Sequence, residues 1–181
     1  NGMEGGRDEE CGAGLVRRHP AASDRRLVIA VIKTITDLER IGDEAERIAR
    51  MAVHVAQEGT AGTQGRPYMP LLGMGDLVRR NLRAALDAFA RVDAAAALTV
   101  VKSDRQIDRE YEAIIRQSIT FMMEDPRTIG HCLDIMWSAR ALERIGDHTR
   151  NICEYLIYLV EGKDIRHTSL EEVEAIVGTR E

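Results

Sequence analysis

The chain has 181 residues, of which 44% are hydrophobic, 30% charged and only 4% aromatic, and its formal net charge is −5. The low aromatic content favours helices over a β-sandwich or barrel, because strands are rich in aromatic and β-branched residues. The acidic balance argues against a general nucleic-acid-binding surface, which would be basic. The three cysteines are widely spaced, and we find neither an apolar run long enough to span a membrane nor a signal peptide. We therefore expect a reduced, cytoplasmic protein.

Apolar residues recur at helical spacing along most of the chain. Asp93 is a plausible N-cap for one helix, and Gly162 is a natural stop for another. A short amphipathic stretch follows a capping signal at Thr168 and Ser169. The predicted long helices cover residues 24–57, 71–92, 94–123 and 127–161, and the short one covers 170–177. In the first long helix we expect a buried stripe of Val28, Val31, Ile35, Leu38, Ala45, Ala49 and Ala52.

One hexapeptide, Leu-Glu-Arg-Ile-Gly-Asp, occurs twice. It spans Leu38–Asp43 and returns, letter for letter, as Leu142–Asp147. A repeat of this kind indicates two similar structural units in tandem. The glycine-rich segment 59–67 has the composition of a linker between them. The predicted organisation is the remainder of a first unit at 1–58, a linker at 59–67, a second three-helix unit at 68–162, and a tail at 163–181.

Each hexapeptide places a Glu and an Asp four residues apart, so that both carboxylates project from one face of a helix. These pairs are Glu39 with Asp43 and Glu143 with Asp147. A third pair, Asp104 and Asp108, falls within an apolar stripe of the preceding helix. Buried carboxylates are costly unless they are paired or bind a cation. If the two helices pack antiparallel, four carboxylates converge.

Two resolutions of this charge repulsion remain open from the residues alone. Hard metal ions prefer oxygen ligands, and Gly42 and Gly146 would let a backbone or a metal cluster approach closely. Alternatively, the acids line solvated faces and pair with nearby arginines, namely Arg40, Arg47, Arg144 and Arg150.

Other chemistry-bearing residues give weaker signals. Neither hexapeptide carries the Glu-x-x-His spacing of ferritin-like di-iron sites, and no nucleophile motif is found, so we do not expect an enzyme. His148 faces about 100° away from Asp147 on a helix. We expect surface or satisfied polar histidines at 54, 131 and 167, and core methionines at 122, 123 and 136.

The chain resembles the PhoU family of bacterial phosphate-transport accessory proteins and phosphate-signalling regulators. The similarity covers nearly the whole chain and keeps the order of the family's motifs. It is carried by the segments Asp37–Asp43, Asp87–Arg91, Asp108–Glu112, Phe121–Asp125, Glu143–Asp147 and Asn151–Glu154.

The resemblance implies an all-α fold of two tandem three-helix-bundle repeats, with the first repeat truncated at its N-terminus in this chain. It implies multinuclear metal sites, with iron favoured and manganese, magnesium or zinc as alternatives. The implied ligands are Glu39, Asp43, Asp104, Asp108, Glu143 and Asp147. The partner carboxylates of Glu39 and Asp43 are expected on the helices that this sequence lacks, and the glycine-rich residues 1–14 depart from the family.

The resemblance also implies a function without catalysis. The protein would repress the phosphate-starvation response, modulate phosphate uptake, and act as an adaptor between the phosphate ABC transporter and its sensor histidine kinase. Its expected partners are the transporter's ATPase subunit, the kinase, and a second copy in a homodimer or higher oligomer, with no nucleic acid and with membrane contact only through partners. A metal-dependent helical-bundle enzyme and a plain scaffold remain the alternatives.

Overall fold

The structure, a computed structural model, describes residues 22–57, 69–163, 165, 168 and 170–178. Every regular element in these parts of the chain is helical, which confirms the all-α prediction. The proposed linker at 59–67, Ser169 and His167 lie outside the described residues. The elements are α2 (Ala22–Gln57), α3 (Met69–Arg91), α4 (Ala94–Glu124), the short 3₁₀ helix η2 (Pro126–Thr128), α5 (Ile129–Glu161) and α6 (Leu170–Gly178).

Local capping signals fix several helix ends where the sequence predicts them. The Asp93 side chain accepts a hydrogen bond from the Ala96 backbone N–H at 2.9 Å and so caps α4. Gly162 ends α5 with φ of 70°, a left-handed conformation that suits glycine. The predicted start of α5 at residue 127 is two residues early, because the segment after Asp125 first forms the 3₁₀ turn η2.

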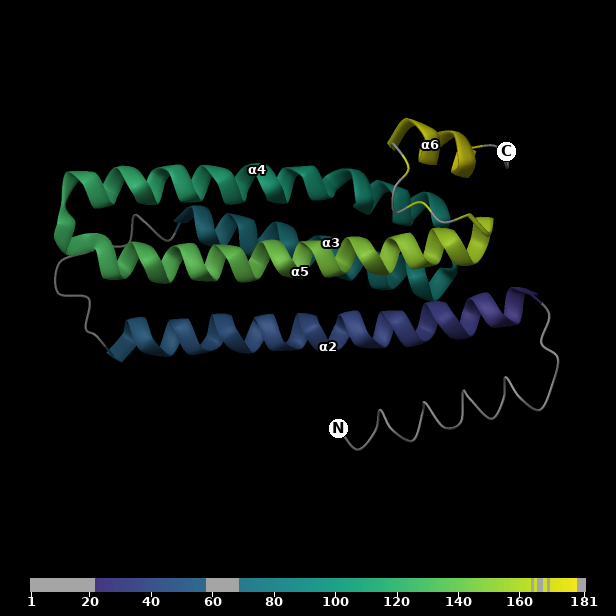
Figure 1. Cartoon of the computed structure of the whole chain (residues 1–181), viewed down its shortest axis with the longest axis horizontal. Coiled ribbons are helices and arrows are strands. Elements are labelled where there is room, and N and C mark those ends of the chain that lie inside the picture. The colour runs from purple at the N-terminus through teal and green to yellow at the C-terminus, as the bar shows by residue number, and fades with distance from the viewer. Residues whose placement is uncertain (1–21, 58–68, 164, 166–167, 169, 179–181) are drawn as a thin grey trace.

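The long helices lie side by side in an elongated bundle, with α5 in contact with α2, α3 and α4 (Figure 1). Both α4 and α2 run antiparallel to α5, as the colour gradient in Figure 1 shows. The short helix α6 lies against α4 near the end of the bundle where α5 finishes. In the described parts of the chain no helix is long and apolar enough to cross a membrane.

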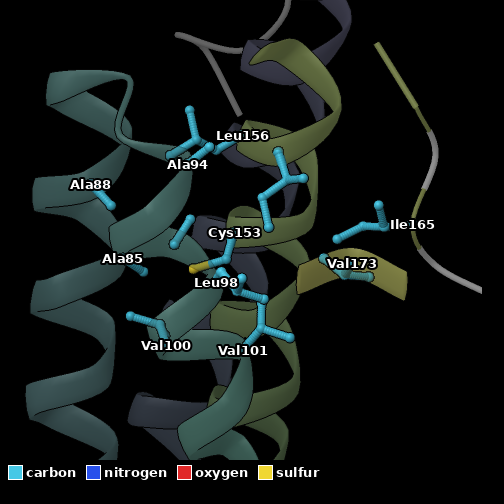
Figure 2. Packing of buried hydrophobic residues seen from close by; sticks show 12 residues of the cluster. Ala85, Ala88, Ala94, Leu98, Val100, Val101, Cys153, Leu156, Ile165 and Val173 are labelled. Carbon is cyan, nitrogen blue, oxygen red and sulfur yellow. The ribbon is translucent and has the colours of Figure 1, made fainter. Parts of the chain in front are cut away.

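Two clusters of buried apolar side chains form the core. One joins α3, α4 and the C-terminal half of α5 and is closed by Ile165 and Val173, the latter from α6 (Figure 2). Its centre holds Cys153 and Leu156, both fully buried. The other cluster links all four long helices; its buried members are Ile41, Met74, Leu77, Val78, Ile107, Ile114, Ile135, Ala139, Ile145 and Ile152.

The buried face of α2 differs from the predicted stripe. Among the described residues, Val28, Val31 and Ile35 are half-buried, but the later members of that stripe are exposed: Leu38, Ala45, Ala49 and Ala52. The residues that face the bundle instead alternate at steps of four and three, which is a 3.5-residue repeat. They are Ala30, Thr34, Asp37, Ile41, Glu44, Ile48 and Met51. The sequence reading missed this seam because three of its seven positions are polar.

The seam of α4 also follows a strict 3.5-residue repeat, which corrects the expected position of one acid. Beyond Asp104 the buried positions are Ile107, Ile114 and Ser118, so Asp108 is exposed. The predicted stripe ran from Asp104 through Asp108, Tyr111, Ile115 and Ile119, and its four-residue steps carry it off the buried face. Met123, predicted to be core, is 81% exposed for the same reason. Met122 and Met136 are half-buried.

Candidate metal centre between α4 and α5

Asp104 is the most deeply buried of the predicted ligands. Its side chain is only 7% exposed, and Arg150 from α5 donates a hydrogen bond from Nη1 to its Oδ2 at 2.9 Å. Burial raises the pKa of Asp104; the Arg150 charge opposes this effect, and the charges of Asp108 and Asp147 add to it. Asp108 on α4 and Asp147 on α5 therefore act on the same carboxyl, as the antiparallel packing of the two helices predicts.

Glu143 lies beside this group on α5. Arg140 donates a hydrogen bond from Nη1 to Glu143 Oε1 at 2.8 Å, and its guanidinium sits 5.9 Å from the centre of the Tyr111 ring on α4. The other carboxylate oxygen, Oε2, is buried and has no hydrogen-bond partner among the described residues. Burial, and next the Asp147 charge, raise the pKa of Glu143. A buried carboxylate oxygen without a hydrogen-bond partner is suited to act as a ligand to a cation.

We refer to Asp104, Asp108, Glu143 and Asp147 as the carboxylate cluster. Burial and the negative charges of its members raise the pKa values of Asp104 and Glu143, but the side chains in their present conformations do not form a complete metal-binding site. Within the described residues, no three His, Cys, Asp or Glu groups lie close enough together to hold one metal ion. Asp108 is exposed and the Asp147 side chain is 41% exposed, so both can rotate toward Asp104 without disturbing the core.

Gly146 allows α4 and α5 to approach closely at the cluster. A Cβ atom at this position would lie 3.0 Å from Ile107 Cδ1 and 3.2 Å from Asp104 Oδ1. A side chain of any other residue would therefore press on both the core and the carboxylate. The repeat-equivalent Gly42 on α2 meets no atom of the described residues within 4 Å of the same hypothetical Cβ. The close approach predicted for both glycines is thus observed at Gly146.

The first copy of the hexapeptide lies apart from the carboxylate cluster. Glu39 and Asp43 are both exposed on α2. Asp43 lines a cavity of about 630 Å³ between α2 and α5, together with Arg47, Arg50 and Trp137. In the repeat, the exposed Glu39 and Gly42 of α2 correspond to Glu143 and Gly146 of α5, and Gly146 packs against α4. The described residues thus bring Asp104 and Glu143 together, and leave Glu39 and Asp43 facing outward.

The two hexapeptides cross each other, since α2 and α5 pack antiparallel around them. On one side of the crossing, Asp37 Oδ1 lies 2.7 Å from His148 Nδ1 and accepts a hydrogen bond from Asn151 at 3.3 Å. On the other side, Arg144 Nη1 lies 2.7 Å from Glu44 Oε1, in an ion pair whose carboxylate is only 4% exposed. Recognising the 3.5-residue seam of α2 would have located both buried acids.

The remaining predicted polar residues behave largely as expected. His54 lies 3.5 Å from Asp134 on α5. Of the four arginines expected to make surface ion pairs, Arg47, Arg144 and Arg150 find acidic partners, and each contacts a buried carboxylate, Glu44 or Asp104. Arg40 makes no ion pair with the described residues. Cys132 and Cys153 are free thiols in the core. Burial raises the pKa of the Cys153 thiol to about 12.

Comparison with known proteins places this all-helical tandem-repeat architecture in a class. The family model described as "PhoU domain" matches residues 7–52 and 71–156, so its two matched segments each contain one copy of the hexapeptide. The chain therefore belongs to the PhoU domain family.

Similar proteins agree with this assignment. A Pseudomonas putida protein named phosphate-specific transport system accessory protein PhoU homolog is 52% identical over 98% of this chain and 68% of its own length. The Escherichia coli K12 accessory protein PhoU is 41% identical, over 100% of this chain and 73% of its own. The crystal structure of PhoU from Pseudomonas aeruginosa matches with a TM-score of 0.83 at 51% identity, covering 90% of this chain and 77% of that one.

Proposed function

We propose that the chain regulates phosphate uptake and represses the phosphate-starvation response, as an adaptor between a phosphate ABC transporter and its sensor histidine kinase. The observation that carries this proposal is 52% identity, along 98% of the chain, to a protein named as an accessory of the phosphate-specific transport system. In this role the protein works in the cytoplasm, as a homodimer or higher oligomer, and meets the membrane only through its partners.

An adaptor of this kind has to present surfaces rather than perform chemistry. The described helices offer two candidates for such surfaces. One is the exposed stripe of α2 formed by Leu38, Ala45, Ala49 and Ala52, and the other is the set of apolar residues where α4 passes into α5, which includes Met123, Ile129 and Leu133. Apolar side chains that stay exposed in a bundle commonly mark places where another protein binds.

Binding to the two proposed partners can be tested separately. Purified chain would be passed over the immobilised ATPase subunit of the phosphate transporter and over the cytoplasmic part of the kinase. We expect retention by both, with unrelated transporter ATPase and kinase as controls. Failure to bind either partner would contradict the adaptor role. A turnover assay with iron or manganese and oxygen tests the enzyme alternative, since an adaptor gives no product.

We further propose that the carboxylate cluster holds multinuclear metal, with iron favoured and manganese, magnesium or zinc as alternatives. The oxygen donors suit hard cations, the buried Glu143 Oε2 needs a partner, and Gly146 lets Asp104 approach α5 closely. Bound cations would offset the burial and the neighbouring negative charges that raise the pKa of Asp104 and Glu143. Glu39 and Asp43 are proposed as ligands of a second site on α2.

Metal content provides the test of the carboxylate cluster. Protein purified without chelator would be analysed by inductively coupled plasma mass spectrometry. A variant with Asp104, Asp108, Glu143 and Asp147 all changed to Ala should lose the metal of this centre. A control variant with Glu46, Asp76, Glu112 and Glu124 changed to Ala removes the same charge from exposed positions and should keep it. Equal metal in the cluster variant and the wild type would overturn the proposed centre.

A further inference from the structure

Arg150 on α5 contacts three acidic side chains in and around the carboxylate cluster. Its Nη1 lies 2.9 Å from Asp104 Oδ2 and 3.8 Å from Asp147 Oδ1, and its Nε lies 3.4 Å from Glu154 Oε1. A guanidinium remains charged at any physiological pH and presents several donors in a rigid fork. Arg150 therefore supplies the positive charge that a buried carboxylate such as Asp104 requires.

The same contacts place Arg150 in competition with a metal ion. An ion held by Asp104 and Asp147 would use carboxylate oxygens that now face Arg150 Nη1. Arg150 Nη1, at 2.9 Å from Asp104 Oδ2, fills the position from which an ion would ligate that oxygen. Arg150 and a metal ion thus cannot both occupy the position between Asp104 and Asp147.

The structure gives the displaced side chain a place to go. A cavity of about 360 Å³ adjoins Arg150 and is bounded by Glu154 on α5 and by Ile165, Thr168 and Val173 from the tail and α6. Glu154 is already within 3.4 Å of Arg150 Nε, so the guanidinium keeps one acidic partner if it leaves Asp104. The Arg150 side chain is 39% exposed and has several rotatable bonds, which permits this movement.

We propose that Arg150 is a built-in competitor for the metal: it neutralises Asp104 when no metal is bound and releases that carboxylate when an ion enters the carboxylate cluster. This inference rests on the proposed metal centre and adds to it a residue that sets the metal affinity. Each binding event must break the Arg150–Asp104 ion pair. The centre consequently favours ions of high charge, because a monovalent ion gains too little from the cluster to displace a guanidinium.

Manganese titration of metal-free protein tests the proposal. Protein stripped with chelator would be titrated with MnCl₂, and free Mn²⁺ would be measured by electron paramagnetic resonance. We expect Arg150→Gln to bind Mn²⁺ about tenfold more tightly than the wild type, or more, because no ion pair has to be broken. The matched control is Arg105→Gln, which removes a positive charge from the wall of the same cavity but leaves the Arg150–Asp104 pair intact.

The possible outcomes separate this inference from the metal centre itself. If the wild type binds Mn²⁺ and Arg150→Gln binds no more tightly, Arg150 is not a competitor and the centre stands. An equal gain in Arg105→Gln would also overturn the inference, since the effect would then be one of net charge. If neither the wild type nor Arg150→Gln binds Mn²⁺, the carboxylate cluster fails as a site and the inference fails with it. Binding by Arg150→Gln alone supports competition.

A second variant covers the case in which Arg150→Gln does not fold. Arg150→Lys keeps the positive charge but loses the fork that reaches Asp104 and Glu154 together. We expect its Mn²⁺ affinity to lie between those of the wild type and Arg150→Gln, a gain of roughly threefold. An affinity equal to or below that of the wild type would overturn the proposal. Helical content measured by circular dichroism shows whether each variant is folded.

Discussion

The contact between Asp37 and His148 contributes to the stability of the fold at the crossing of the two hexapeptides. Both side chains are buried, and their contact joins α2 to α5. A buried polar group without its partner pays the full cost of leaving water, which exceeds the gain from making the bond. An exposed ion pair on α2, such as Arg50 with Glu46, stays hydrated, so its loss changes the free energy of unfolding very little.

We therefore predict that His148→Ala lowers the free energy of unfolding by about 2–4 kcal/mol, because Asp37 would keep only the longer hydrogen bond from Asn151. The measurement is urea unfolding followed by circular dichroism. Arg50→Ala is the control and should leave the free energy nearly unchanged. Comparable losses in the two variants would show that the Asp37–His148 contact carries no special weight.

The partly buried carboxyl of Glu143 should make the stability of the protein depend on pH. Its pKa in the folded protein is raised above the ordinary value of 4.5 by burial and by Asp147. Between those two pKa values the folded state binds more protons than the unfolded state, so this carboxyl reduces stability as pH rises through that interval. Glu143→Gln removes the effect. In chelator, the stability of the variant relative to the wild type should therefore increase from pH 4.5 toward neutrality.

The same urea experiment, repeated across this pH range, measures that difference. Glu46→Gln, at an exposed position on α2, controls for the loss of one negative charge. A difference between Glu143→Gln and the wild type that does not change with pH would contradict the prediction. A difference that grows as pH falls would mean that the folded protein, rather than the unfolded chain, holds the glutamate proton less tightly.

At the scale of the helix, the two hexapeptides provide a matched experiment. Gly146→Ala places a Cβ against Ile107 and Asp104, and overpacking of this kind costs about 1–3 kcal/mol. Gly42→Ala has open space among the described residues and gains helix propensity of up to about 1 kcal/mol. We expect the first substitution to destabilise the protein and the second to stabilise it, as measured by thermal unfolding. Shifts of the same sign would contradict this.

The helices themselves could be predicted far better than their faces. Caps such as Asp93 and Gly162 are local signals, and they fixed helix ends to within one or two residues. The buried seam of α2 contains the acids Asp37 and Glu44, whose burial depends on partners more than 90 residues away in the chain. No local pattern shows that a distant histidine or arginine will pair with these acids. The sequence therefore favours the apolar stripe as the buried face of α2, although much of that stripe is exposed.

The candidate site was predicted in part for the same reason. Asp104 lies in an apolar seam, which identifies it as a buried acid, and the repeated hexapeptide identifies Glu143. Arg140 reaches Glu143 three residues along the same helix, whereas only the packing of α4 on α5 shows that Arg150 reaches Asp104. The ligand roles of all six predicted acids remain predictions until metal content is measured.

For the whole molecule, the arrangement predicts where the fold opens first. Helix α5 is covered by α2, α3 and α4, whereas α6 rests on α4 through Val173 and an ion pair of 2.8 Å between Lys102 and Glu174. Segments with little buried surface open locally, and central ones exchange only when the protein unfolds. We predict strong hydrogen-exchange protection in the central turns of α5 and weak protection throughout α6.

Hydrogen exchange followed by mass spectrometry of peptic peptides measures this order. Peptides around Ile145 and Ile152 should exchange at the rate of global unfolding, and mild denaturant should accelerate them more than any other described segment. The peptide that contains Val173 should exchange orders of magnitude sooner. Equal protection in α5 and α6 would mean that the bundle and the tail open as one unit.

Trp137 gives the molecule an optical reporter of its own. It is the only tryptophan in the chain, it is 58% exposed, and it shares a cavity with Asp43. Indole emission shifts and quenches when water is excluded or when a paramagnetic ion comes near. Fluorescence of the unlabelled protein therefore observes the outward-facing hexapeptide, and it can follow ligand or partner binding on that side in real time without any engineered probe.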